Sequence, residues 1–180
     1  MTQTTSPEDL QALLEPVKKI AYQAGRYIME IYDRGFEVEE KADNTPLTEA
    51  DLAAHKTIME GLTALTPDVP VLSEESKPKT FEERSSWSRY WLVDPLDGTR
   101  EFIKRNGEFT VNIALVEEGH TVFGVVFAPV LNELYVGIAG RGAFRCRNEE
   151  NLDQPLDHLL QFADSLPVEG TQTKTFRVVA

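Results

Sequence analysis

The sequence has little cysteine and a deficit of positive charge. Its one cysteine, Cys146, cannot form an internal disulfide, and without a second thiol or a nearby histidine it makes no zinc site. A reducing, intracellular setting is therefore expected. Lys and Arg number 18 against 30 Asp and Glu, which gives a net charge of -12. A field of that sign repels nucleic-acid polymers and anionic membranes, so neither is expected as a partner.

Long apolar runs are also missing. The N-terminus has no basic segment followed by an apolar core, and no apolar stretch approaches the roughly 20 residues of a membrane span. We expect no transmembrane segment and a cytoplasmic location, with peripheral attachment at the inner membrane as the alternative. What remains is 180 residues with 41% hydrophobic content, enough for one domain with its own core.

Two helices are predicted in the N-terminal third. Ser6 followed by Pro7 marks a helix start, and apolar residues recur at helical spacing from Leu10 up to Gly35, which predicts one long amphipathic helix. In the second, Thr48 and Asp51 form an [ST]-x-x-[DE] capping pattern. That pattern places Asp51 in the first turn.

The pattern then changes to β. Strands are predicted at 69–73 and 90–93, separated by an exposed polar connection, and from Phe109 a meander of four strands with short loops follows. Residues 156–166 fit a short helix and 175–180 the beginning of a strand. The predicted fold class is α+β, a layered sandwich with two long helices packed on a largely antiparallel sheet.

The segment WLVDPLDGT, residues 91–99, combines an apolar strand with two acids. Asp94 is predicted to end the strand, because Pro95 bars further ladder pairing. Asp97 and Gly98 permit a sharp turn, and Thr99 begins a short helix whose free N–H groups could hold an anion.

A second pair of acids, Glu74 and Glu75, ends the preceding strand. If the two strands lie side by side, one of these glutamates converges with Asp94 and Asp97, and the cluster would repel itself without cations. Hard oxygen ligands suit Mg²⁺. Beside a phosphate-binding helix start, they predict metal-assisted hydrolysis of a phosphate ester.

Other interpretations fit the same residues. Asp-Gly is a common turn, and Asp51 is a helix cap before it is anything else. The three histidines, His55, His120 and His158, show no metal-ligand spacing and are predicted to be structural or exposed. Phosphatases of the haloacid dehalogenase type use Asp-x-Asp, whereas this chain has Asp-Pro-Leu-Asp. Direct attack by water is therefore favoured over an aspartyl-phosphate intermediate.

Three short segments, in order, resemble a known family. TEAD (48–51), EES (74–76) and DPLDGT (94–99) are similar to the signature of the lithium-sensitive, Mg²⁺-dependent phosphatases that include inositol monophosphatase and fructose 1,6-bisphosphatase. Within that superfamily, the stretches VLSEES, RYWLVDPLDGTREFIKRNGEFTVNIALVE and GVVFAPVLNELY resemble the bacterial 3'(2'),5'-bisphosphate nucleotidases. The likeness extends through most of residues 10–145.

The resemblance implies a set of metal ligands. Glu74, Asp94 and the backbone carbonyl of Leu96 would hold one Mg²⁺, and Asp94 with Asp97 would hold a second. The complete family site takes two or three ions. Reasoning from spacing reaches the same acids but leaves Glu74 and Glu75 as alternatives.

It also implies catalytic and substrate-binding roles. Glu74 and Thr99 would orient the attacking water, with Asp51 accepting from the Thr99 hydroxyl, and the amides of Gly98 and Thr99 would cradle the phosphate. Leu96 and Asp97 line the same substrate site in that comparison.

The substrate implied is a small nucleotide bisphosphate, adenosine 3',5'-bisphosphate, hydrolysed to AMP and phosphate in sulfur assimilation, with the 3'-phosphorylated sulfate donor as a second substrate. The alternatives are inositol monophosphatase activity and a non-catalytic metal- or phosphate-binding fragment that self-associates. Four basic residues are candidates to offset the acidic field near the substrate: Lys41, Arg100, Lys104 and Arg105.

The chain departs from the family pattern in one respect. Family members carry a second α/β half with a W-D-x-A-A-like stretch, whose Asp completes the second metal site. Here tryptophan occurs only at 87 and 91, and neither is followed by Asp. We therefore expect residues 1–170 to form an N-terminal metal-binding domain and residues 171–180 to begin a truncated second domain.

Overall fold

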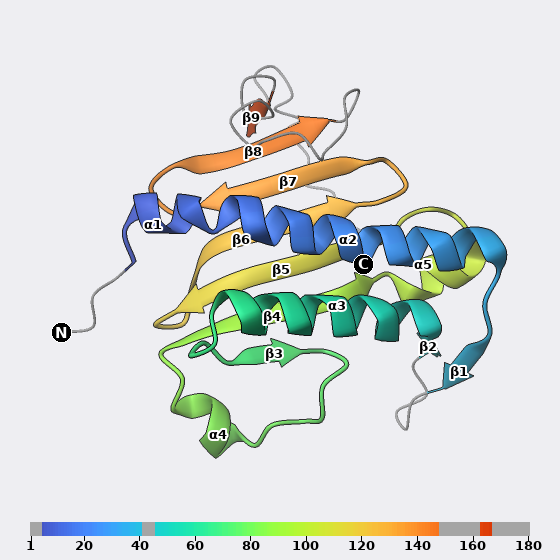
Figure 1. Cartoon of the computed structure of the whole chain (residues 1–180), viewed down its shortest axis with the longest axis horizontal. Coiled ribbons are helices and arrows are strands. Elements are labelled where there is room, and N and C mark those ends of the chain that lie inside the picture. Colours follow the sequence, from blue (N-terminus) through green and yellow to red (C-terminus); the bar gives the residue numbers. More distant parts are fainter. Residues whose placement is uncertain (1–4, 41–45, 148–162, 167–180) are drawn as a thin grey trace, which may run out of the picture.

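The fold is a sheet with its two longest helices on one face, seen in a computed structural model that describes residues 5–40, 46–147 and 163–166 (Figure 1). Two strands, β1 (Val38–Glu40) and β2 (Pro46–Thr48), form a small antiparallel ribbon. Seven strands form the main sheet in the order β3-β4-β5-β6-β7-β8-β9. Within the described residues, no helix is long and apolar enough to cross a membrane.

The N-terminal helical segment is interrupted once. It consists of α1 (Pro7–Ala12) and α2 (Leu14–Arg34), so the prediction of one unbroken helix is wrong at Leu13. There the backbone N–H bonds to the carbonyl of Leu10, three residues back, which tightens one turn before the α-helical pattern resumes. The next helix, α3 (Glu49–Leu65), begins at Thr48 with the predicted capping box.

The main sheet confirms the predicted meander. Its strands from β4 to β9 pair antiparallel, while β3 and β4 are parallel, with Leu72 opposite Leu92. Because β3 and β4 run the same way, their C-terminal ends meet at one edge of the sheet. The strands are β3 (Val71–Ser73), β4 (Arg89–Asp97), β5 (Thr110–Glu117), β6 (His120–Ala128), β7 (Glu133–Ile138), β8 (Gly142–Arg147) and β9 (Asp164–Leu166).

The predicted end of β4 is wrong. The strand continues past Asp94, which pairs with Asn112, to Asp97, which pairs with Thr110. Pro95 lies in the register shift between these two pairs, where a missing N–H breaks no ladder bond. Both acids of the segment are therefore carried by one strand.

The C-terminal part of the predicted helix at 156–166 is also wrong. Residues Asp164–Leu166 form β9 on the edge of β8. Arg145 makes an ion pair with Asp164 at 2.7 Å, and β9 satisfies the open hydrogen-bonding groups of β8. The remainder of that segment and the predicted strand at 175–180 lie outside the described residues.

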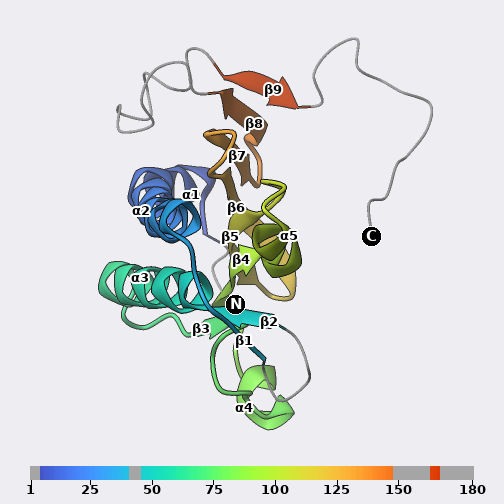
Figure 2. The same ribbon diagram turned by 90° about the vertical axis from the view of Figure 1, so that its right-hand side faces the viewer.

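The core lies between the helices and one face of the sheet. Figure 2 shows α2 and α3 on the same side of the strands. Alternate strand residues such as Trp91 and Val93 are buried, whereas Leu92 between them is 45% exposed. Gly25 lets α2 approach β6, because a β-carbon there would lie 2.4 Å from the ring of Phe127.

Two short helices complete the described residues. The predicted exposed connection between β3 and β4 contains α4 (Phe81–Ser85), which has no buried residue. The predicted helix after Gly98 is α5 (Thr99–Lys104), at the end of the sheet near the C-terminal end of α2 (Figure 1). Phe102 anchors it, with its ring 4.5 Å from that of Phe36 and 5.1 Å from that of Tyr32.

Candidate active site

Asp51 is a buried carboxylate held at both oxygens. It is 1% exposed, and its Oδ2 accepts from the backbone N–H of Thr48 at 2.8 Å and from the Thr48 hydroxyl at 2.6 Å. Its Oδ1 accepts from the hydroxyl of Thr99 at 3.0 Å. The capping box therefore fixes Asp51 in one orientation and leaves one oxygen for a residue far along the chain.

Thr99 reaches Asp51 because of the turn before it. Gly98 has φ 94°, a left-handed conformation that side chains disfavour, and a β-carbon there would lie 2.8 Å from the carbonyl oxygen of Glu108. Thr99 then begins α5, and its hydroxyl also lies 3.3 Å from the carbonyl of Leu96. The predicted catalytic pair Asp51 and Thr99 is thus in direct contact.

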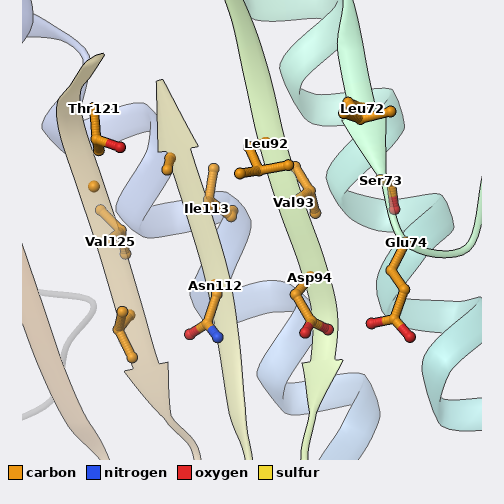
Figure 3. Close-up of a pocket in the computed structure, with 13 residues that line it drawn as sticks. Leu72, Ser73, Glu74, Leu92, Val93, Asp94, Asn112, Ile113, Thr121 and Val125 are labelled. Carbon is orange, nitrogen blue, oxygen red and sulfur yellow. The ribbon is translucent and has the colours of Figure 1, made fainter. Parts of the chain in front are cut away.

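Asp94 lies on β4, and Glu74 directly follows the neighbouring strand β3. The N–H of Glu74 donates to the carbonyl of Val93 at 3.1 Å, which fixes the backbone just after β3 against β4. Figure 3 shows the two carboxylates at the same level and turned toward each other. Both residues line one groove, and Glu75 does not appear among its lining residues. Glu74 remains the predicted ligand, and of the two glutamates it is the one that lines this groove with Asp94.

Asp94 lies in an environment that disfavours its charged form. Burial first, then the charges of Glu74 and Asp97 and a hydrogen bond to Glu74, together raise the pKa of Asp94 to about 7, while the Leu96 amide opposes the shift. The Oδ1 atom of Asp94 is buried, and no hydrogen-bond donor of the described residues reaches it. An orphaned oxygen beside a second carboxylate is the environment that a hard cation would stabilise.

The carboxylates lie near one another but do not surround a single point. Among residues 5–40, 46–147 and 163–166, no three His, Cys, Asp or Glu side chains are gathered tightly enough to enclose an ion. Asp97 is exposed, and its carboxylate accepts from the side-chain amide of Asn112 at 3.0 Å. The donor types fit Mg²⁺.

Asn112 was missed by sequence reasoning. It pairs with Asp94 across β4 and β5, bonds to Asp97, and lines the same groove (Figure 3). In the sequence it lies within the alternating run TVNIALVE as one polar residue of a half-buried strand. Only the strand register reveals that it faces the acids.

Two of the four basic candidates, Lys104 and Arg105, make contacts away from Glu74 and Asp94. Arg105 donates to the carbonyl of Tyr32 at 2.6 Å and stacks over that ring at 5.0 Å, so it anchors the end of α5. Lys104 pairs with Glu101 at 3.4 Å, and Arg100 is exposed. Lys41 lies outside the described residues.

The histidines are placed as predicted where they are described. His55 is half-buried, with its Nδ1 2.8 Å from the hydroxyl of Ser73. His120 is exposed and lies 2.9 Å from the carbonyl of Glu118. His158 lies outside the described residues.

An open groove begins at the acids and extends over the outer sheet face. Its volume is about 640 Å³, and Glu74, Asp94 and Asn112 line one end. Apolar side chains line the rest, including Leu92, 45% exposed, and Val126, 38% exposed. A small polar group could therefore meet the acids while the remainder of a ligand or partner lay along the sheet.

The sequence matches a known protein family. The pattern of the Inositol monophosphatase family matches residues 9–176. The chain belongs to this family. Its α+β layered fold agrees with that membership.

Relatives in the family are about half identical to this chain over the residues that align. The 3'(2'),5'-bisphosphate nucleotidase CysQ of Escherichia coli (strain K12) is 58% identical over 131 residues, 72% of this chain and 53% of that protein. The CysQ of Haemophilus influenzae is 45% identical over 153 residues, 80% of this chain and 57% of that protein. The chain therefore spans about half the length of these family members.

A solved family structure supports the fold. The crystal structure of CysQ from Bacteroides thetaiotaomicron, a bacterial member of the inositol monophosphatase family, matches with a TM-score of 0.71 and 38% identity. The match covers 93% of this chain and 60% of that one. The helices and sheet described above are therefore those of the family.

Proposed function

We propose that this chain carries the catalytic site of a Mg²⁺-dependent 3'(2'),5'-bisphosphate nucleotidase. The reaction is hydrolysis of the 3'-phosphate of adenosine 3',5'-bisphosphate to AMP and phosphate, with the 3'-phosphorylated sulfate donor as a second substrate, in sulfur assimilation. The observation that carries the proposal is the Asp51–Thr99 hydrogen bond at the edge of the sheet that bears Glu74 and Asp94. High identity to CysQ proteins supports the choice of substrate.

The proposed proton path runs through Thr99. Its hydroxyl proton is directed to Asp51 Oδ1, which leaves the oxygen lone pairs free to accept a proton from a water molecule. Asp51 can then take up the hydroxyl proton at Oδ1, because both hydrogen bonds from Thr48 go to the other oxygen, Oδ2. Glu74 would accept the water's second hydrogen bond and so orient its lone pair toward phosphorus.

The proposed metal ligands are the acids of β3 and β4. Glu74, Asp94 and the carbonyl of Leu96 would hold one Mg²⁺, and Asp94 with Asp97 would hold a second. When bound, Mg²⁺ supplies Lewis-acid neutralisation of phosphate charge. The orphaned Oδ1 of Asp94 and its raised pKa support a cation there.

The substrate's phosphate would lie at the Gly98–Thr99 turn, whose amides remain the proposed donors. Residues 1–170 would be the metal-binding domain, followed by a second domain that supplies further contacts and completes a site of two or three ions. Self-association and a cytoplasmic location remain predictions. A binding fragment without turnover is the second candidate, because the chain covers about half of its relatives.

The test measures phosphate release from adenosine 3',5'-bisphosphate with Mg²⁺, with and without Li⁺. Turnover by this chain that Li⁺ inhibits and Thr99→Val abolishes supports the proposal. No turnover here, but turnover after the chain is extended to the length of its relatives, supports a catalytic half. No turnover in either form supports the binding fragment. A preference for inositol monophosphate in the same assay would replace the proposed substrate.

A further inference from the structure

His55 and Ser73 connect the helix of Asp51 to the strand of Glu74. His55 lies one helical turn after Asp51 on α3, and Ser73 is the last residue of β3, directly before Glu74. The Nδ1 of His55 and the Oγ of Ser73 are 2.8 Å apart. A single side-chain hydrogen bond therefore bridges the two elements that carry the proposed proton acceptor and a proposed metal ligand.

Ser73 is buried, and its backbone is hydrogen-bonded. It is 4% exposed, and its carbonyl accepts from the N–H of Ser76 at 3.0 Å in the turn after β3. The next N–H, that of Glu74, bonds to Val93 on β4. The backbone around Glu74 is thus tied to β4 on one side, while the Ser73 side chain ties it to α3.

We propose that His55 is a positioning residue whose hydrogen bond to Ser73 holds the end of β3, and so sets how Glu74 stands against Asp94 and how tightly the site binds a divalent cation. This inference rests on the proposed function for its consequence at the metal. The statement that α3 holds the end of β3 rests only on the hydrogen bonds described above.

The imidazole acts through geometry rather than charge. Burial lowers the pKa of His55, which favours a neutral ring at neutral pH. A neutral ring has one donor and one acceptor nitrogen, and the Ser73 hydroxyl can complement either at Nδ1. Two amide variants of His55 therefore separate the roles of its ring nitrogens. The polar end of an Asn side chain lies near the position of Nδ1, which bonds to Ser73, and that of Gln lies near the position of Nε2.

The experiment compares His55→Asn, His55→Gln and Ser73→Ala in this chain. Two quantities are measured: the hydrogen-exchange rate of the Glu74 amide in metal-free protein, and the affinity for Mn²⁺ alone. We expect His55→Gln and Ser73→Ala each to speed exchange of the Glu74 amide about tenfold and to weaken Mn²⁺ binding about tenfold. Each variant loses one buried hydrogen bond that supports a proposed metal ligand. We expect His55→Asn to stay within about threefold of wild type for both quantities.

The matched control is Thr66→Val. Thr66 follows the other end of α3, and its hydroxyl accepts from the Trp91 indole N–H at 2.8 Å, so its loss also breaks a contact between a helix end and the sheet. We expect Thr66→Val to lower thermal stability about as much as His55→Gln does. The hydrogen-exchange rate of the Glu74 amide and the affinity for Mn²⁺ should stay unchanged. If Thr66→Val shifts both as His55→Gln does, the effect is general destabilisation and the positioning role is overturned.

The outcomes separate this inference from the proposed function. If wild-type chain binds no Mn²⁺, the proposed metal site fails, and amide exchange alone still decides whether His55 holds the strand end. If the Gln and Ala variants match wild type in exchange and affinity, the positioning role is wrong even where the metal site stands.

Discussion

The hydroxyl of Thr99 donates a 3.0 Å hydrogen bond to Asp51, 48 residues earlier in the chain. Thr99 is the first residue of α5 and follows the Gly98 turn, whereas Asp51 lies in the first turn of α3 and is oriented by its capping box with Thr48. We expect Thr99→Val to lower the rate of phosphate release by about 10²- to 10⁴-fold, since proton transfer by a positioned side chain contributes that much. Thr99→Ser should retain most of the rate.

The control for that comparison is Thr57→Val on α3. Within the part of the chain that the structure describes, the Thr57 hydroxyl bonds to its own helix, at the carbonyl of Ala53, 2.9 Å away. The rate of phosphate release by Thr57→Val should equal that of wild type in the same assay. Equal rates for Thr99→Val and Thr57→Val would remove Thr99 from the proton path.

Asp51 should contribute to stability as well as to chemistry. Asp51→Ala removes three hydrogen bonds at a helix N-terminus, so we expect the free energy of unfolding in urea to fall by about 2–4 kcal/mol. Ser6→Ala at the exposed cap of α1 is the control, with an expected loss of about 1 kcal/mol. Equal losses would mean that burial of Asp51 adds nothing to its capping role.

Asp94 predicts a specific pH dependence for the metal-free protein. Its pKa rises from 3.8 to about 7 on folding, so the folded state favours the protonated acid. The associated stability is fully present below about pH 4 and is lost as the pH rises through about 7. Thermal unfolding in EDTA should therefore show Asp94→Asn gaining stability over wild type between pH 5 and 8, by a margin that grows with pH.

Mg²⁺ should reverse that ranking. A cation that binds only the folded state at a hundred times its Kd adds about 2.7 kcal/mol, and Asp94→Asn should lose this gain. Thermal unfolding at pH 8 with and without Mg²⁺ measures both effects. A wild-type midpoint that does not respond to Mg²⁺ contradicts the proposed metal site.

Asn112 should influence the metal through Asp97. Asn112→Ala removes the 3.0 Å donor to that carboxylate, and we expect Mg²⁺ affinity to change by about two- to tenfold in calorimetric titration. Asn112→Asp places another acid beside Asp94 and should lower the metal-free unfolding midpoint at pH 8. Thr121→Ala, at the far end of the same groove, should alter neither quantity.

Gly98 should tolerate no side chain. Gly98→Ala brings a positive φ together with a β-carbon 2.8 Å from the Glu108 carbonyl oxygen. Gly119 also has positive φ, 76°, but open space around it, so Gly119→Ala measures the conformational cost alone, about 1–2 kcal/mol. We expect Gly98→Ala to cost at least about 1 kcal/mol more in urea unfolding. Equal costs would show that the turn can move away from Glu108.

Local patterns determined much of this protein. Helix spacing predicted α2, the capping box predicted the start of α3 at Thr48, and alternation predicted the meander from β5 to β8. These features follow from interactions within a few residues, which a sequence displays directly. The same reasoning reached Asp94 and Asp97, because an acid pair after an apolar strand is visible locally.

Tertiary structure decided the rest, because it depends on contacts between distant segments. Pairing with β5 carried β4 beyond Pro95, and pairing with β8 made a strand of Asp164–Leu166 where the local pattern favoured a helix. The parallel pairing of β3 and β4 placed Glu74 and Asp94 in one groove, and the register of β4 and β5 brought Asn112 to the acids. The sequence by itself specified which residues could do chemistry, whereas the strand register specified which of them meet.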